Sequence, residues 1–227
     1  MKKNLIVCAV LLLAFKISHA QTEKGTQTLG LDFGAGRSTS NQFIINTSDN
    51  STESVGSATT NFNFGPNYSY FIADKLDIGV ALNYQSLVQT YSAVNFADNS
   101  GYPTKYSNKN FDASVYIRKY YMYKNVIGFR TGAYFMYSDG TNKSTYIGTY
   151  AANSSNGTTH DYEAQLRLDL VYYPSKRLGV SASIAEVGYS WYKSTNGNLG
   201  NGNGDNANVD FISDGLQLSV FYVFGSK

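Results

Sequence analysis

The chain has 227 residues, of which only 15% are charged, and its formal net charge is +2. Soluble domains usually carry about 25% charged residues, so this composition is unusual for a surface that faces water. Another 15% of the residues are aromatic, and 20 of them are tyrosines. A charge balance this close to zero gives no sign of a nucleic-acid partner.

The first 20 residues have the layout of a secretory signal peptide. Lys2 and Lys3 precede an apolar run over residues 5–15, and the small residues of Ser18-His19-Ala20 favour cleavage before Gln21. The run is shorter than the roughly 18 to 20 apolar residues that a transmembrane anchor would need. We therefore expect residues 1–20 to be removed and residues 21–227 to form one domain.

Removal of this segment changes the chemistry of the chain. The only cysteine, Cys8, lies inside it, so the mature protein would have neither a disulfide nor a reactive thiol. Three of the 18 basic residues leave with it, and 15 then remain against 16 acidic ones. Nothing in the mature chain indicates a cofactor.

The mature chain is dominated by apolar residues that alternate with polar or small ones, the period of a β-strand. Leu29, Leu31, Phe33 and Ala35, for example, alternate with Gly30, Asp32 and Gly34. The alternation changes phase once, near Ala185, where a β-bulge would explain the shift. Eight segments follow the pattern and are predicted to be strands, most of them long enough to cross a bilayer at a tilt: residues 29–35, 62–70, 76–85, 111–118, 127–137, 162–172, 178–191 and 216–224.

The connections between these segments are alternately short and long. Short turns are predicted at residues 73–75, 122–125 and 174–177, and long loops rich in Ser, Thr, Asn and Gly at 38–60, 92–108, 138–158 and 193–208. Short turns at one rim and long loops at the other are typical of an outer-membrane barrel. The pattern predicts an all-β fold: a closed antiparallel up-and-down transmembrane β-barrel of eight strands, with four long extracellular loops and three short periplasmic turns.

Alternation alone does not say which face points inward, and a soluble barrel or a sandwich has the same period. The polar face is mostly Gly, Ala, Ser and Asn, which suit a narrow barrel interior better than a solvated surface. The apolar face carries aromatic residues at both ends, as expected of girdles at two membrane interfaces. Those near the short turns are Tyr68, Tyr70, Tyr121, Tyr172, Tyr222 and Phe224, and those near the long loops are Phe62, Tyr84, Phe111, Phe135, Tyr137, Tyr162, Tyr189 and Trp191.

Charged residues of both signs also occur on the polar face, with arginine as the cation. Buried charges need partners, so we expect an ion-pair network inside the barrel. Its predicted members are Asp32, Asp112, Arg118, Arg130, Glu163, Arg167 and Asp169.

This combination of signal peptide, alternating strands and connections resembles the small outer-membrane barrels typified by outer membrane proteins A and X. The resemblance covers nearly all of the mature chain, as a pattern rather than a specific motif. It implies that the barrel assembly machinery reads the last strand through Tyr222 and Phe224, although Gly225-Ser226-Lys227 follow here. It also implies contact with outer-membrane lipid and lipopolysaccharide, and a monomer. Since we expect no second, peptidoglycan-binding domain after the barrel, the resemblance does not imply a tether to the cell wall.

Three other interpretations remain open. His160, the single histidine of the mature chain, would be the catalytic residue of a lipid A-modifying enzyme, but no compact His-x-Ser arrangement accompanies it. The carboxylates and arginines would alternatively line a narrow channel. Residues 196–210 place oxygen ligands at alternating positions but lack the glycine and terminal glutamate of an EF-hand calcium loop. We expect a non-enzymatic protein without a bound metal, acting in adhesion or envelope stability through an external ligand of its loops.

Overall fold

The computed structural model describes residues 21–45, 52–91, 104–146, 154–196, 200–211 and 217–225, so the expected signal peptide lies outside the described residues. These residues form nine β-strands whose pairings are all antiparallel. The strands are β1 (Gln27–Ile45), β2 (Thr52–Ala73), β3 (Leu76–Tyr91), β4 (Lys105–Tyr123), β5 (Ile127–Thr145), β6 (Ser155–Ser175), β7 (Leu178–Asn196), β8 (Gly200–Phe211) and β9 (Gln217–Phe224).

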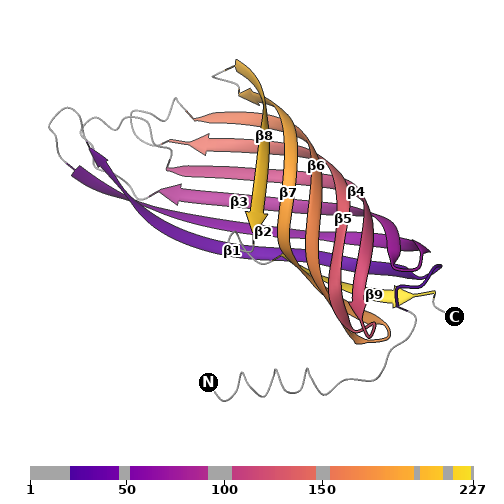
Figure 1. The fold of residues 1–227 in the computed structure, drawn as a ribbon. Coiled ribbons are helices and arrows are strands. Elements are labelled where there is room, and N and C mark those ends of the chain that lie inside the picture. The colour runs from indigo at the N-terminus through magenta and orange to yellow at the C-terminus, as the bar shows by residue number, and fades with distance from the viewer. Residues whose placement is uncertain are drawn as a thin grey trace, which may run out of the picture.

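The strand pairings form a ring. Each strand from β1 to β7 pairs with the next one along the chain, and β9 pairs with both β7 and β1. Residues Gln27–Gly34 of β1 lie opposite β9, so the sheet closes on itself near the C-terminal end of the chain (Figure 1). Closure satisfies backbone groups that an open sheet edge would leave unpaired.

The ninth strand, β8, is the main departure from the prediction of eight strands. It pairs with residues 185–196 of β7, whereas β9 pairs with residues 178–182 of the same strand. β8 and β9 therefore pair with successive parts of the same edge of β7. Beyond Gly34, β1 has only β2 as a partner among the described residues. The ring is thus complete at one end of the barrel, and β1 and β8 are unpaired with each other at the other end.

Where the structure describes them, the predicted long loops at residues 38–60, 138–158 and 193–208 are largely strand, so the prediction of loops there was wrong, whereas most of the loop predicted at 92–108 lies outside the described residues. β1 continues to Ile45, β5 continues to Thr145, and residues 193–208 lie mostly in the β7–β8 hairpin. Their polar side chains still form cross-strand pairs, such as the 2.9 Å hydrogen bond between the hydroxyls of Ser40 and Ser57. The backbone hydrogen bonds between two strands do not require an apolar face where the strands are in water. The polar composition of these segments therefore did not reveal that the strands continue.

The three turns at the opposite rim are short. Asp74–Lys75 joins β2 to β3, residues 124–126 join β4 to β5, and residues 176–177 join β6 to β7. Lys75, Lys124 and Asn125 have φ values of 61°, 48° and 55°. Positive φ is what tight hairpin turns require, because it matches the twist of the flanking strands.

The phase change near Ala185 is a β-bulge, as predicted. Leu168 lies opposite Ala185 and Asp169 opposite Ser183, which leaves Ile184 as the extra residue of β7. One extra residue reverses the faces of a strand. The bulge therefore allows Val180 before it and Val187 after it to point to the same face of the barrel.

The distribution of side chains is the reverse of that in a soluble protein. Leu29, Val80 and Leu166 are 56%, 51% and 61% exposed, whereas Asp77 and Arg118 are 0% and 5% exposed. The outward position of the apolar face is therefore confirmed. Other large apolar side chains on the outer surface include Phe33, Phe64, Leu82, Val115, Ile117, Phe129, Phe135 and Val187.

Candidate functional site

The first part of the candidate site is a buried ion pair between neighbouring strands. Asp77 of β3 lies directly opposite Arg118 of β4, and both side chains point into the barrel. Arg118 donates through Nε and Nη2 to the two carboxylate oxygens at 3.0 and 2.6 Å. This bidentate geometry is the strongest form of the arginine–carboxylate pair.

A second pair lies on the next two strands. Arg130 of β5 is directly opposite Asp169 of β6, and it donates to Asp169 Oδ2 from Nε at 2.8 Å and from Nη2 at 2.6 Å. Nη2 also donates to the hydroxyl of Ser181 on β7 at 2.9 Å. Arg130 is therefore held by groups from the next two strands, β6 and β7.

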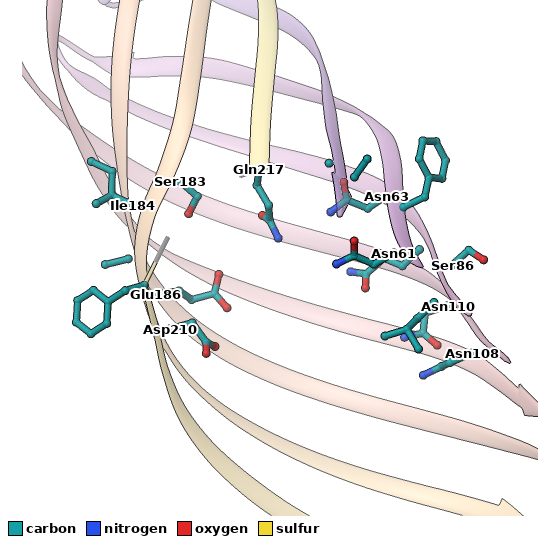
Figure 2. A pocket seen from close by; sticks show the side chains of 17 residues that line it. Asn61, Asn63, Ser86, Asn108, Asn110, Ser183, Ile184, Glu186, Asp210 and Gln217 are labelled. Atoms are coloured by element: carbon teal, nitrogen blue, oxygen red, sulfur yellow. The ribbon is translucent and has the colours of Figure 1, made fainter. Parts of the chain in front are cut away.

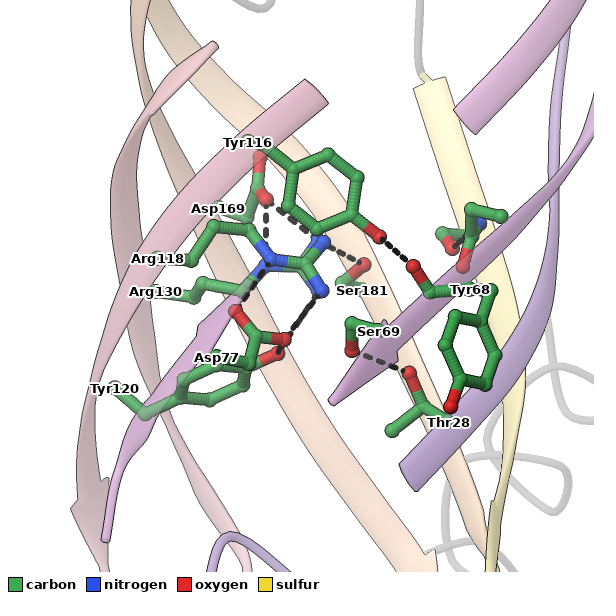
Figure 3. A network of polar contacts seen from close by, with 12 residues as sticks. Thr28, Tyr68, Ser69, Asp77, Tyr116, Arg118, Tyr120, Arg130, Asp169 and Ser181 are labelled. Carbon is green, nitrogen blue, oxygen red and sulfur yellow. Dashed lines mark hydrogen bonds and ion pairs between the residues drawn. The ribbon is translucent and has the colours of Figure 1, made fainter. Parts of the chain in front are cut away.

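Tyr120 connects the two pairs (Figure 3). Its hydroxyl donates to Asp77 Oδ2 at 3.0 Å and accepts a hydrogen bond from Arg130 Nη1 at 3.4 Å. The guanidinium of Arg118 also lies 4.0 Å from the ring centroid of Tyr116, a favourable cation–π distance. These residues form one connected network, which we call the lumen floor: Asp77, Tyr116, Arg118, Tyr120, Arg130, Asp169 and Ser181.

An apolar cluster fills the barrel on the turn side of the lumen floor. It consists of Phe71, Tyr120, Val171, Tyr173, Phe221 and Val223, each no more than 3% exposed. The glycine at position 179 makes room for one ring, because a Cβ there would lie 2.1 Å from Phe221 Cε2. Side chains thus close the interior, as expected for an eight-stranded ring.

The residues before β1 cover the same end of the barrel. Gln21 and Thr22 are 2% and 6% exposed, and the carbonyl of Thr22 accepts a hydrogen bond from the backbone N–H of Lys75 at 2.6 Å. The side-chain amide of Gln21 donates to the carbonyl of Ser175 in the β6–β7 turn. The segment therefore bridges two of the three turns and adds a cap beneath the apolar cluster.

A cavity of about 340 Å³ lies on the other side of the lumen floor. Asp112 reaches into it from β4 and is 2% exposed, but only neutral side chains hold it: Gln85 and Asn83 donate to Oδ2 at 2.8 and 3.3 Å. Among the described residues, Asp112 and Glu163 make no ion pair within 4.0 Å. The cavity is therefore rich in carboxylates above a floor in which both arginines are paired.

The cavity continues sideways into a second one of about 300 Å³ (Figure 2). Asn63, Gln85, Asn110, Ser183, Glu186 and Gln217 line both cavities. The second cavity also touches Ala35 of β1 and Phe211 of β8, the two strands that do not pair with each other. It therefore follows the break in the ring above β9.

The predicted network is brought together only in part. Arg118, Arg130 and Asp169 belong to the lumen floor, and Arg167 forms a separate pair with Glu186 at 3.3 Å. Asp32, Asp112 and Glu163 have no arginine within ion-pair distance among the described residues, so the expectation that each buried charge is paired was wrong for them. Register explains the difference, because the inward residues opposite Asp112 and Glu163 are uncharged.

Several members of the lumen floor were missing from the predicted network. Asp77 was on the polar face in the sequence, and the register of β3 against β4 places it opposite Arg118. Tyr120 and Ser181 carried no comparable signal. Their roles depend on residues from three strands converging across the barrel, and a period of two does not determine that convergence.

His160 lies on the outer surface rather than in the cavity. Its Nδ1 is 3.3 Å from Asp139 Oδ1 and 3.2 Å from the hydroxyl of Tyr137, and about half of its side chain is exposed. Its partners are thus a carboxylate and a phenol, and the arrangement supplies a polar surface pair.

The remaining candidates are placed as follows. Tyr222 is 46% exposed on β9, where its hydroxyl accepts a hydrogen bond from Arg177 at 3.2 Å, and Phe224 lies opposite Gln27. In the segment 196–210, which was compared with a calcium loop, residues 200–210 belong to β8 and pair with β7, whereas residues 197–199 lie outside the described residues. Within the described ranges, no group of three His, Cys, Asp or Glu residues could hold a metal ion, and no helix is long and apolar enough to cross a membrane.

Comparisons with known proteins give similarity in structure but not in sequence. No protein-family model matches the chain, and no curated protein matches it in sequence. Among solved structures, the outer membrane protein OprG from Pseudomonas aeruginosa is 12% identical, with coverage of 93% of this chain and 100% of that one and a TM-score of 0.45.

Two further structures extend this comparison. Ail, the attachment invasion locus protein of Yersinia pestis, is 9% identical over 88% of this chain and 99% of its own, with a TM-score of 0.39. The outer membrane protease OmpT from Escherichia coli is 10% identical over 92% of this chain and 97% of its own, with a TM-score of 0.35. The structural neighbours include small outer-membrane β-barrel proteins, as the resemblance noted from the sequence implies.

Proposed function

We propose that this protein is a non-enzymatic integral protein of a bacterial outer membrane, exported through a cleaved signal peptide. The observation that carries the proposal is the reversed distribution of side chains, with Leu29, Val80 and Leu166 outside and Asp77 and Arg130 inside. In water, an apolar surface that runs around the whole barrel would far exceed the few hundred Å² that soluble monomers usually expose. In a bilayer, the same surface contacts acyl chains, and the ring of strand pairings satisfies the backbone.

The proposed barrel is a transmembrane one of eight strand positions, in which β8 and β9 together occupy the eighth position against β7. Two features support this assignment. Both lie on the same side of β7, and the break between them coincides with the break in the pairing of β1. The termini of the mature chain would then lie at the periplasmic rim with the three short turns.

Within this family of barrels, we assign a structural or surface-interaction role. The β1–β2, β5–β6 and β7–β8 hairpins extend well beyond the aromatic residues near the predicted long loops. These hairpins would therefore project from the membrane. Strand-supported hairpins offer a firm platform for recognition, which scaffolded loops usually carry. Adhesion and envelope stability are the functions that suit such a platform.

Fractionation together with heat-modifiable migration tests the proposal. The protein should sediment with outer membranes, resist alkaline extraction, and migrate faster on a detergent gel when it is not boiled, because a closed barrel stays folded in detergent. Recovery of the mature chain as a soluble periplasmic species would refute the proposal. Mass spectrometry of the purified protein would locate its first residue, and any start other than Gln21 would contradict the predicted cleavage.

A narrow channel is the alternative that one observation favours, namely the polar cavity above the lumen floor. The floor, the apolar cluster and the Gln21–Thr22 cap all lie between this cavity and the turn side. We therefore expect the protein to be electrically silent in planar bilayers. Replacing two floor residues, with Tyr120→Ala and Arg130→Ala, should produce conductance if the floor is the barrier. Steady conductance of the unchanged protein would support the channel instead.

A lipid A-modifying enzyme is the second alternative, and it requires His160. The exposed position of His160 beside Asp139 and Tyr137 supports a non-enzymatic role. Mass spectrometry of lipid A from cells with and without the protein decides between these interpretations. A mass change that disappears with His160→Ala would establish the enzyme.

A further inference from the structure

We propose that the outer surface of β4, β5, β6 and β7 binds the phosphorylated headgroup of a membrane lipid, in a hollow that contains Lys109 and Lys143. This inference rests on the membrane-spanning orientation proposed above, and it adds a site and a ligand chemistry to it. The hollow has a volume of about 480 Å³.

The hollow lies on the lipid-facing side of the wall. Phe111 is 53% exposed on the outer face of β4, and alternation places Lys109, two residues away, on the same face. Tyr137, Thr141 and Lys143 share the outer face of β5 by the same period. The residues between them face the interior, as Asn108 and Asn110 show by lining the inner cavity.

An aromatic row runs beneath the hollow, separated from it by one outward row that contains Phe111, Asp139, His160 and Lys193. Tyr137, Tyr162 and Trp191 lie opposite one another on β5, β6 and β7. Their ring centroids are 5.1 Å apart for the two tyrosines and 5.9 Å apart for Tyr162 and Trp191. Stacked tyrosine and tryptophan side chains of this kind are typical of the membrane–water interface. The row therefore marks the upper limit of the hydrocarbon.

Strand geometry places the lysines above the aromatic row, within reach of the headgroup layer. Lys109 lies opposite Thr141, four residues beyond Tyr137, which is roughly 13 Å along the strand and about 10 Å along the membrane normal at a tilt of about 40°, and Lys143 lies one row further, opposite Ser107. The polar layer of a bilayer adds roughly 5 to 8 Å on each side of the hydrocarbon. Lysine side chains reach toward such a layer while their aliphatic parts stay against apolar surface.

The lining of the hollow fits a phosphate. Lys109 and Lys143 are both exposed and offer ammonium groups, and the hydroxyls of Thr141, Thr158 and Thr195 lie in one row with Lys109 across four strands. The described lining contains no carboxylate. Charge-assisted hydrogen bonds to phosphate oxygens are strong, and hydroxyls supplement them.

The outward row just below the hollow carries charges of both signs. Lys193 Nζ lies 5.0 Å from the ring centroid of Trp191, so a third ammonium group stands at the edge of the aromatic row. The nearest outward carboxylate on β5 is Asp139, and it is paired with His160 at 3.3 Å. A lipid would place its phosphate between Lys109 and Lys143 and its acyl chains along the aromatic row below.

The single tryptophan provides a direct test, because Trp191 lies on β7 four residues from Thr195 of the hollow. The protein is refolded into phosphatidylcholine vesicles that contain either phosphatidic acid or phosphatidylcholine with brominated chains, and quenching of Trp191 is compared. Brominated phosphatidic acid should quench more strongly. Lys109→Gln with Lys143→Gln should reduce this preference about 25-fold, since each lysine near an anionic surface contributes a factor of about five.

The matched control is Lys24→Gln with Lys176→Gln, which removes the same charge at the turn-side rim, where both residues are exposed. This control should keep the preference for phosphatidic acid. The proposal is overturned if the unchanged protein shows no preference, if Lys109→Gln with Lys143→Gln keeps it, or if both double variants lose it equally.

A further arm separates a lipid headgroup from free phosphate. Inorganic phosphate at matched ionic strength should leave the quenching preference in place, because a membrane-held headgroup has a much higher local concentration. Complete loss of the preference would assign the hollow to free phosphate and overturn the lipid assignment. Heat-modifiable migration of each variant is measured alongside. Normal migration without lipid preference would refute this inference alone, whereas loss of folded barrel from membranes would refute the proposed function.

Discussion

Two aspartates inside the barrel provide the sharpest test of how its charges contribute to stability. Asp77 is 0% exposed and Asp112 is 2% exposed, so both carboxylates are removed from bulk water. Asp77 accepts both hydrogen bonds of Arg118 and one from Tyr120, whereas Asp112 accepts hydrogen bonds from the uncharged Asn83 and Gln85. The same type of residue therefore has a cationic partner in one case and neutral partners in the other.

Replacing Asp77 with alanine should destabilise the barrel strongly. The Arg118 side chain is only 6% exposed and would lose both strong hydrogen bonds. Removing one partner of a buried ion pair costs about 3 to 5 kcal/mol, because the other charge stays buried without compensation. The nearby guanidinium of Arg130 would increase this cost, since Tyr120 places it beside the same carboxylate.

Replacing Asp112 with asparagine should have a small effect, within about 1 kcal/mol of the unchanged protein. The variant loses the stronger hydrogen bonds of a carboxylate, but it also removes a buried charge that has no cation beside it. The double variant Asp77→Leu with Arg118→Met provides the matched control. It should recover most of the stability lost in Asp77→Ala, because it removes the ion pair completely.

Reversible urea unfolding in phospholipid vesicles measures these differences in free energy. Fluorescence of Trp191, on a different strand from both aspartates, reports the folded fraction. The reasoning is refuted if Asp77→Ala costs less than about 1 kcal/mol, or if Asp112→Asn costs as much as Asp77→Ala. Equal costs would mean that burial, and not the arginine partner, determines the contribution of each carboxylate.

Two further predictions concern the outer face and the close packing of the lumen. Leu166→Arg should destabilise the barrel by roughly 2 to 4 kcal/mol because it places a charge against lipid, whereas Gln165→Arg on the inner face should be tolerated. The gel shift after refolding measures the folded fraction of both variants. Equal losses of folded protein would contradict the assigned facing of the two residues. Gly179→Ala should destabilise by about 1 to 3 kcal/mol because its Cβ would overlap the Phe221 ring. Gly202→Ala, where the nearest atom is 3.2 Å away, should change the urea midpoint little, and a larger effect there than at Gly179 would disprove the packing argument.

Several elements of the fold were predictable because they depend on local order. Alternation identified the membrane-crossing part of each strand, and the phase change at Ala185 revealed the bulge beside Leu168. The short turns were visible from breaks in the alternation. The strand ends were not, because the hairpins continue through residues such as Ser40 and Ser57, whose polar side chains carry no signal for a half-buried sheet.

The sequence predicted which charged residues of the candidate site face inward, but it did not predict which of them pair with each other. The sequence marked Arg118, Arg130 and Asp169 as inward charges, since their neighbours alternate as apolar residues. It did not identify Asp77 as the partner of Arg118, and it did not show that Asp112 would have only uncharged hydrogen-bond partners among the described residues. An ion pair depends on which residues the register places opposite each other on neighbouring strands.

The sequence by itself determined which face of each strand is apolar, because the period of a strand is two whatever surrounds it. Only the tertiary structure decided which charges meet, where the lumen is closed and that, among the described residues, β1 and β8 do not pair with each other above Gly34. These features depend on register and on closure of the ring. Both are set by residues far apart in the chain, so no local pattern contains them.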